Sequence, residues 1–177
     1  MTIRGVEHIG LTVPDINQAE QFFINALEAS VLYRIVPDND PQKSIAGDGL
    51  TTINGFPADM RITGLTMLRL KNGCNIELFQ VLPAATVKSN SIGHEGISHF
   101  SVYVDDIYAA AQKLRQHGAQ LFDGPNDCFA QEEGQGNQTW FCRTPFGVLI
   151  ELITLPSEIQ YDQGATQKRW LPARNGE

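Results

Sequence analysis

An internal repeat restricts the fold of this chain more than any other feature of its sequence. The nineteen residues from Gly5 read GVEHIGLTVPDINQAEQFF, and the nineteen from Gly96 read GISHFSVYVDDIYAAAQKL, with seven identical positions. A second pair of stretches aligns RLKNGCNIEL at 69–78 with RTPFGVLIEL at 143–152, with five identical positions. Because both stretches recur in the same order, the chain is predicted to contain two units of the same plan.

The first stretch of each copy begins with the pattern of a half-buried strand. In the segments HIGLTV and HFSVYV, apolar residues recur at every second position. Side chains alternate between the two faces of a strand, so these apolar residues share one face. His8 and His99, which begin the two segments, lie on the opposite face.

A helix is predicted directly after each strand. Asp15 suits the N-cap position, and the apolar residues that follow it keep the helical period. The second helix is expected to run from about Asp106 to His117, where Gly118 can adopt the positive φ that ends a helix. Each helix should cover the apolar face of its strand, which leaves the two histidines on the uncovered face.

The second stretch of each copy predicts two strands joined by a tight turn that contains glycine. Glu77 lies in the last strand of the first copy, and Glu151 lies at the matching place in the second. Each glutamate has an isoleucine before it and a leucine after it, so its carboxylate interrupts an apolar strand on the face that the helix leaves uncovered. Retaining a carboxylate in such a strand is costly unless the charge has a partner.

Four side chains of this pattern form a candidate metal site. If the two copies are related by a pseudo-twofold axis, His8, Glu77, His99 and Glu151 converge on one point. Two imidazoles and two carboxylates suit one divalent ion such as nickel, cobalt, manganese, zinc or iron, and an octahedral ion would keep two positions open. A single histidine on a strand is more often a hydrogen-bonded structural residue, and a single glutamate can form a cross-strand ion pair. The duplicated arrangement favours the metal site.

Charge and composition exclude several functional classes. The 177-residue chain has a net charge of −7, which disfavours binding to nucleic acid. It has no apolar run of about 18 residues, so no membrane span is predicted, and its first residues lack the apolar core of a signal peptide. The three cysteines, Cys74, Cys128 and Cys142, form no CxxC pair. They are interpreted as reduced thiols of a cytoplasmic protein.

At these residues the chain resembles the vicinal oxygen chelate superfamily, which includes glyoxalase I, methylmalonyl-CoA epimerase and extradiol dioxygenases. The resemblance lies in the segments EHIGLTVPDINQAEQFF, NIELF, ISHFSVYVDDI and TPFGVLIELI. It implies an α+β fold of two tandem βαβββ modules that form a cupped mixed sheet around a metal. The family's ligand positions correspond to His8, Glu77, His99 and Glu151. The modules are expected at 3–83, with an insertion near 37–60, and at 94–156, followed by a polar tail at 157–177.

The resemblance also implies an activity. Four ligands favour the glyoxalase I and methylmalonyl-CoA epimerase branches, although Thr12 stands where glyoxalase I commonly has an arginine for glutathione, and Glu77 stands where the epimerase usually has glutamine. The leading hypothesis is a metal-dependent isomerase, epimerase or lyase that moves a proton through a metal-chelated enediolate of a small carbonyl compound. Glu151 or Glu77 would act as the base. The alternatives are an extradiol-type dioxygenase and a resistance-type binding protein without chemistry. A homodimer is possible.

Overall fold

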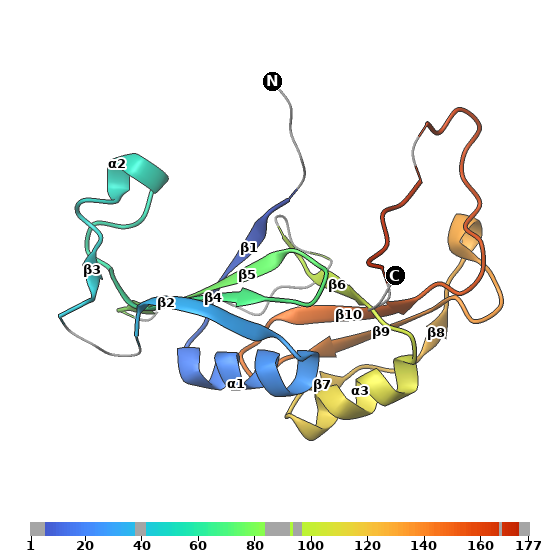
Figure 1. Cartoon of the computed structure of the whole chain (residues 1–177), viewed down its shortest axis with the longest axis horizontal. Coiled ribbons are helices and arrows are strands. Elements are labelled where there is room, and N and C mark those ends of the chain that lie inside the picture. The colour runs from blue at the N-terminus through green and yellow to red at the C-terminus, as the bar shows by residue number, and fades with distance from the viewer. Residues whose placement is uncertain (1–5, 38–41, 84–92, 94–96, 167, 174–177) are drawn as a thin grey trace. The chain divides into compact units, whose positions relative to one another are not determined.

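A computed structural model describes residues 6–37, 42–83, 93, 97–166 and 168–173 (Figure 1). The chain divides into two compact units, residues 1–87 and 88–177, and each unit is described by itself below. Among the described residues no helix is long and apolar enough to cross a membrane.

The first unit is a five-stranded mixed sheet with one long helix. Its elements are β1 (His8–Thr12), α1 (Ile16–Leu27), β2 (Ser30–Val36), β3 (Ile45–Ala46), α2 (Thr51–Asn54), β4 (Arg61–Arg69) and β5 (Asn75–Leu82). The strand order is β1-β5-β4-β2, with β3 paired to β4. Strands β1 and β5 are parallel, and the other pairs are antiparallel.

The second unit repeats this plan. Its elements are β6 (Phe100–Tyr103), α3 (Ile107–Gln116), β7 (Gln120–Leu121), β8 (Asn126–Asp127), the 3₁₀ helix η1 (Ala130–Glu132), β9 (Gln138–Arg143) and β10 (Leu149–Thr154). The order β6-β10-β9-β7 matches that of the first unit strand by strand, and the one parallel pair is again the first strand with the last. The predicted α+β fold of two similar βαβββ modules is therefore confirmed.

Both long helices begin at the predicted caps. Asp15 Oδ1 accepts a hydrogen bond from the Gln18 backbone N–H at 2.9 Å, and Asp106 Oδ1 accepts from the backbone N–H groups of Tyr108 and Ala109. These bonds satisfy donors that the first turn of a helix cannot pair internally. The second helix ends as expected, with Gly118 at φ 91°.

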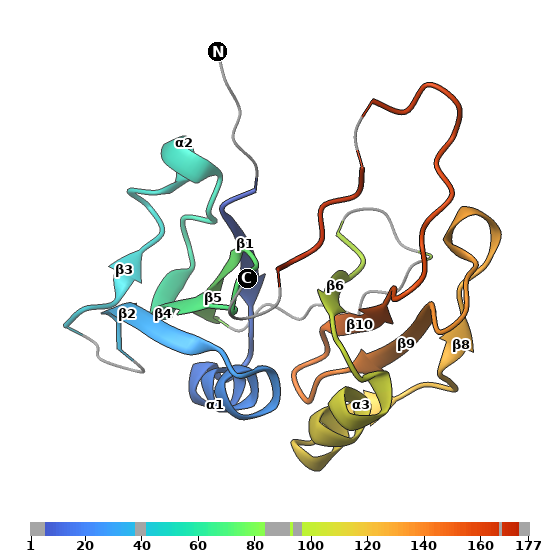
Figure 2. The same cartoon turned by 45° about the vertical axis from the view of Figure 1, so that its right-hand side comes forward.

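In each unit the long helix covers one face of the sheet, as Figures 1 and 2 show. In the first unit the covered face carries Ile76 and Leu78, which are fully buried with Phe23 of α1. In the second unit Ile150 and Leu152 occupy the same places. The face away from the helix carries the residues between them, and these include both glutamates of the candidate site.

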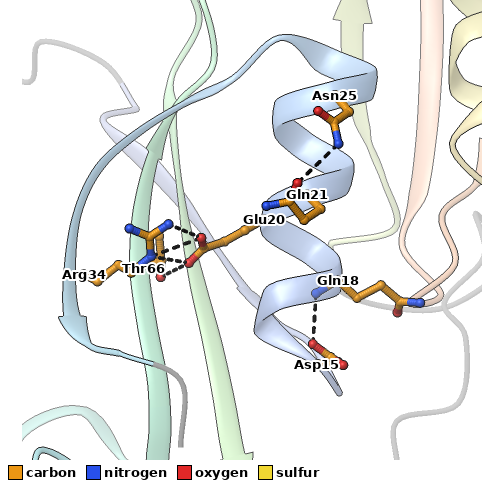
Figure 3. A network of polar contacts seen from close by, with 7 residues as sticks. All are labelled: Asp15, Gln18, Glu20, Gln21, Asn25, Arg34 and Thr66. Carbon is orange, nitrogen blue, oxygen red and sulfur yellow. Dashed lines mark hydrogen bonds and ion pairs between the residues drawn. The ribbon is translucent and has the colours of Figure 1, made fainter. Parts of the chain in front are cut away.

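A polar network fixes α1 to its sheet (Figure 3). Glu20, which is 3% exposed, accepts two hydrogen bonds from Arg34 Nε at 3.0 and 3.1 Å and pairs with Arg34 Nη2 at 2.5 Å. The Thr66 hydroxyl donates to the same carboxylate at 2.5 Å. Because the carboxylate is both paired and hydrogen-bonded, it can be buried beneath the helix.

The predicted insertion is partly built of regular structure. It contributes β3 and α2, and Ile45, Leu50, Phe56 and Met60 pack against a buried cluster of the first unit. That cluster consists of Val36, Ile62, Leu65 and Val81. Residues 38–41 of the insertion lie outside the described residues.

Candidate metal centre

In the first unit His8 and Glu77 come together on the face that α1 leaves uncovered. Strand β1 pairs with β5 so that Gly10 lies opposite Glu77, which puts His8 two residues away on the neighbouring strand and on the same face. His8 Nε2 lies 3.5 Å from Glu77 Oε2. The carboxylate side chain is 19% exposed, so this pair lies at the surface of the sheet with limited access to water.

The second unit makes the same pair from its own residues. His99 directly precedes β6, and Ser101 of that strand lies opposite Glu151 of β10. His99 Nε2 lies 3.6 Å from Glu151 Oε2, and the Glu151 side chain is 16% exposed. Each unit therefore brings together one imidazole nitrogen and one carboxylate oxygen in nearly the same geometry.

The spacing of each pair fits two ligands of one divalent ion. Imidazole nitrogen and carboxylate oxygen bind such ions at about 2.0–2.2 Å, so two of them on one ion lie roughly 3–3.5 Å apart. The observed distances of 3.5 and 3.6 Å are close to this range and too long for strong hydrogen bonds. Within the described ranges no group of three or more His, Cys, Asp or Glu side chains is arranged so that it could hold a metal ion. Each unit thus brings together two side chains that could both bind one ion.

His8 is oriented by its neighbour in sequence. Its Nδ1 lies 2.6 Å from Glu7 Oε2, and Glu7 Oε1 accepts a hydrogen bond from Asn75 Nδ2 at 2.5 Å. The hydrogen bond to His8 is the main reason that the pKa of Glu7 is lowered, and the bond to Glu7 is the main reason that the pKa of His8 is raised. A histidine that gives Nδ1–H to a carboxylate presents an unprotonated Nε2 to a metal.

His99 and Glu151 have different partners. His99 Nδ1 lies 2.9 Å from the Ser98 hydroxyl, and its ring meets the Phe141 ring edge-on at 5.3 Å. The Thr139 hydroxyl donates to Glu151 Oε1 at 2.6 Å. The two half-sites therefore share their donor atoms and differ in the groups that hold them.

One end of the candidate face is apolar in both units. In the first unit Phe79 lies two residues beyond Glu77 on the same face. It packs against the buried cluster that the insertion covers, which includes Leu65 and Val81. In the second unit Ile153 occupies the equivalent position and packs with Cys128 and Leu155, against which Tyr103 and Ile159 also lie. Phe79, Tyr103 and Ile153 lie on the same strand faces as the candidate ligands, as strand alternation requires.

Four residues that hold the candidate ligands were not predicted from the sequence. Glu7 and Ser98 could have been, because each directly precedes the histidine that it contacts. Thr139 and Asn75 reach the site only through the strand register, which pairs Thr139 with Ile153 and Asn75 with His8. No spacing along the chain identifies such partners.

Comparison with known proteins places this geometry in context. A family profile described as the Glyoxalase/Bleomycin resistance protein/Dioxygenase superfamily matches residues 7–141. A 2-epi-5-epi-valiolone epimerase from an Actinomyces species is 31% identical over 172 residues, which cover 94% of this chain and 88% of that enzyme.

Solved structures share the fold at low sequence identity. A glyoxalase family protein from Bacillus cereus superposes with a TM-score of 0.67 at 18% identity, over 87% of this chain and 95% of that one. A variant of the fosfomycin resistance protein FosX from Listeria monocytogenes, solved with Mn(II) and 1S,2S-dihydroxypropylphosphonic acid, gives a TM-score of 0.52 at 14% identity. That match covers 86% of this chain and 90% of that one.

Proposed function

Because the chain belongs to the glyoxalase/bleomycin resistance protein/dioxygenase superfamily, also called the vicinal oxygen chelate superfamily, we propose that it is a divalent-metal-dependent epimerase. Its substrate would be a small hydroxylated carbonyl compound whose stereocentre lies beside the carbonyl group. The observation that carries this proposal is the repeated pair, in which each unit holds one histidine nitrogen 3.5 or 3.6 Å from one glutamate oxygen.

His8, Glu77, His99 and Glu151 would together hold the ion. When bound, a divalent ion supplies a Lewis acid that polarises the substrate carbonyl and acidifies the adjacent C–H group. Glu77 or Glu151 then accepts the proton at a carboxylate oxygen, while the electron pair of the broken C–H bond moves toward the carbonyl group. Delivery of a proton to the opposite face of the same carbon inverts its configuration.

One comparison supports an epimerase over other activities of the superfamily, and another supports a divalent ion in this fold. The curated relative at 31% identity is an epimerase and aligns over nearly the whole chain. The Listeria FosX structure contains Mn(II), which shows that this fold accommodates a divalent ion in at least one member. In this chain the four candidate ligands are all nitrogen or oxygen donors, which manganese, nickel, cobalt, zinc and iron accept.

Metal binding is the first test. The metal-free protein is titrated with Mn²⁺ by calorimetry, beside the His8→Ala and His99→Ala variants. His117→Ala is the matched control, because His117 is exposed at the end of α3. The proposal predicts one ion per four-ligand site in the wild type and the control, with severe loss in both site variants. A wild-type protein that binds none of Mn²⁺, Ni²⁺, Co²⁺ or Zn²⁺ contradicts it.

Proton exchange is the second test. The Mn²⁺-loaded protein is incubated in D₂O with 2-epi-5-epi-valiolone and with other hydroxylated ketones, and the products are followed by proton NMR. Epimerisation predicts loss of one C–H signal beside the carbonyl group and the appearance of the inverted isomer. Oxygen uptake by the iron-loaded protein with a catechol, without such exchange, would instead support a dioxygenase.

A mixing experiment determines which units share a site. If both units of one chain form it, combining the inactive His8→Ala and His99→Ala variants restores nothing. If the protein is a homodimer in which each site takes one unit from each chain, mixed dimers have one intact site. Co-expression then restores about a quarter of the sites, as expected for random pairing in a twofold dimer.

A further inference from the structure

The two candidate ligand carboxylates are held to different degrees. Glu151 has both oxygens engaged, because Oε1 accepts the Thr139 hydroxyl at 2.6 Å while Oε2 faces His99 at 3.6 Å. Glu77 faces His8 through Oε2 at 3.5 Å. Within the described part of the chain, its side chain has no other hydrogen-bond or ion-pair partner.

The strand register explains this difference. In the second unit Thr139 of β9 lies opposite Ile153 of β10. Ile153 is two residues beyond Glu151 on the same face, so Thr139 is a diagonal cross-strand neighbour of Glu151. The equivalent position of the first unit is Leu65, which lies opposite Phe79, two residues beyond Glu77. Leu65 is 6% exposed and belongs to the apolar cluster under the insertion. A leucine there packs well but can donate nothing to Glu77.

The difference affects how easily each carboxylate can move. A hydroxyl-to-carboxylate bond of 2.6 Å is short and charge-assisted, and it fixes the side-chain rotamer of Glu151. Turning Glu151 away would break this bond in a largely buried place, where an unpaired polar group is costly. Glu77 can turn away from His8 without breaking any other hydrogen bond or ion pair to the residues that the structure describes. Glu77 can therefore change its side-chain rotamer more easily than Glu151.

We propose that Thr139 is a positioning residue that holds Glu151 in the orientation of a metal ligand, and that Glu77, which is held less firmly, is the carboxylate that takes the substrate proton. This inference rests on the metal-dependent function proposed above and assigns different roles to two residues that the sequence makes equivalent. In the first transfer the substrate C–H bond breaks, an O–H bond forms on Glu77, and the electron pair remains with the substrate beside its carbonyl group. The negative charge passes from Glu77 to the substrate, so charge and atoms balance.

Metal affinity without substrate tests the positioning role. Mn²⁺ is titrated into metal-free wild type and into the Glu151→Gln, Glu77→Gln and Thr139→Val variants. A firmly held ligand contributes more to binding than one that is held less firmly, so Glu151→Gln should weaken Mn²⁺ binding at least about tenfold more than Glu77→Gln. Thr139→Val, which keeps the shape of threonine, should weaken binding about 10- to 100-fold, the range found when a residue that orients a ligand is removed. Thr139→Ser keeps the hydroxyl and should restore most of the affinity.

Thermal unfolding of the metal-free variants separates positioning from folding. Thr139→Val should unfold at a lower temperature than Thr139→Ser, because it leaves Glu151 Oε1 without its partner, but both should be fully folded at the temperature of the Mn²⁺ titration. A loss of Mn²⁺ affinity in folded Thr139→Val then reflects the missing hydroxyl. Equal affinity losses for the two glutamine variants, together with unchanged affinity in Thr139→Val, would overturn the assignment while leaving the wild-type metal site intact. A wild type that binds no ion would overturn the proposed function itself, and the two failures are therefore distinct.

Proton exchange tests the assignment of the base. At Mn²⁺ concentrations that saturate each variant, Glu77→Gln should abolish deuterium exchange into the compound that the wild type epimerises. Glu151→Gln should retain measurable exchange once it is saturated with metal. The reverse order, with exchange kept in Glu77→Gln and lost in Glu151→Gln, would make Glu151 the base and contradict the proposal.

Discussion

Glu7 and His8, adjacent in the sequence, are joined through their side chains: Glu7 Oε2 lies 2.6 Å from His8 Nδ1. Asn75 of the paired strand holds the other oxygen of Glu7, so the orientation of His8 is fixed from two strands. In the second unit the equivalent nitrogen of His99 lies beside the hydroxyl of Ser98 instead. In the first unit the carboxylate of Glu7 orients the candidate ligand His8. In the second unit the hydroxyl of Thr139 orients the candidate ligand Glu151.

Removing the carboxylate of Glu7 should weaken the metal site without removing a ligand. We expect Glu7→Gln to lower Mn²⁺ affinity about 10-fold, because the orienting partner of a ligand histidine typically contributes 10- to 100-fold and glutamine retains a weaker acceptor. Calorimetric titration of the metal-free protein measures this change. Glu133→Gln, at an exposed position of the second unit, is the control. Equal affinity in the two variants would show that Glu7 has no part in orienting His8.

The same pair predicts a pH dependence of the metal-free protein. The pKa of His8 is raised above 6.5, chiefly by the bond to Glu7. The stability that protonated His8 gains from this bond is therefore fully present below about pH 6.5, and it is lost as the pH rises through the raised pKa of His8. The pKa of Glu7 is lowered below 4.5, so its contribution is present above pH 4.5 and is lost as the pH falls through the lowered value. The pair thus stabilises the unit most between these limits.

An NMR titration of the His8 ring checks this prediction. In metal-free wild type the midpoint should lie above pH 6.5, and in Glu7→Gln it should move to lower pH, because the principal cause of the raised pKa is removed. Glu133→Gln should titrate like the wild type at His8. An identical midpoint in all three proteins would mean that the hydrogen bond does not persist in solution.

Much of the fold could be predicted because its signals are local. The strand faces follow from alternation around His8 and His99, and the helix starts follow from Asp15 and Asp106, whose caps the structure confirms. The His–Glu pairs within each unit could be predicted as well, since the repeat placed a histidine and a glutamate on one face. The convergence of both pairs on one ion remains a proposal.

Other features depend on contacts that the sequence does not encode locally. Helix α1 is followed by the C-cap residue Glu28, which adopts φ 57° without being glycine or asparagine and forms an ion pair with Lys71 at 2.6 Å. The hydroxyl that holds Glu151 comes from a strand whose register is fixed by the whole sheet. The short elements of the insertion could not be predicted from periodicity, because the residues that pack it on the cluster with Leu65 and Val81 are Ile45 of β3 and the scattered Leu50, Phe56 and Met60.

Cysteine reactivity provides a check on the packing of the second unit. Burial raises the pKa of the Cys142 thiol to about 11 and also raises the pKa of Cys128. Since the thiolate is the reactive form, both should remain unreactive toward iodoacetamide in native protein at pH 8. Cys74 is partly exposed and should be modified first, with Cys142 at least about 100-fold slower. Mass spectrometry of native and denatured samples measures this, and labelling of Cys142 at the rate of Cys74 would contradict its buried position.

The Glu20 network predicts a clear loss of stability at a position outside the candidate site. Glu20→Ala removes the shared partner of Arg34 and of the buried Thr66 hydroxyl (Figure 3). Arg34 is 46% exposed and can turn to water, so most of the cost comes from the unpaired hydroxyl and the lost packing beneath α1. We expect the free energy of unfolding of the first unit to fall by about 2–3 kcal/mol, measured by urea titration. Gln21→Ala, on the exposed side of the same helix, should change it by less than about 0.5 kcal/mol. If both variants lost the same small amount, Glu20 would not fix α1 to the sheet.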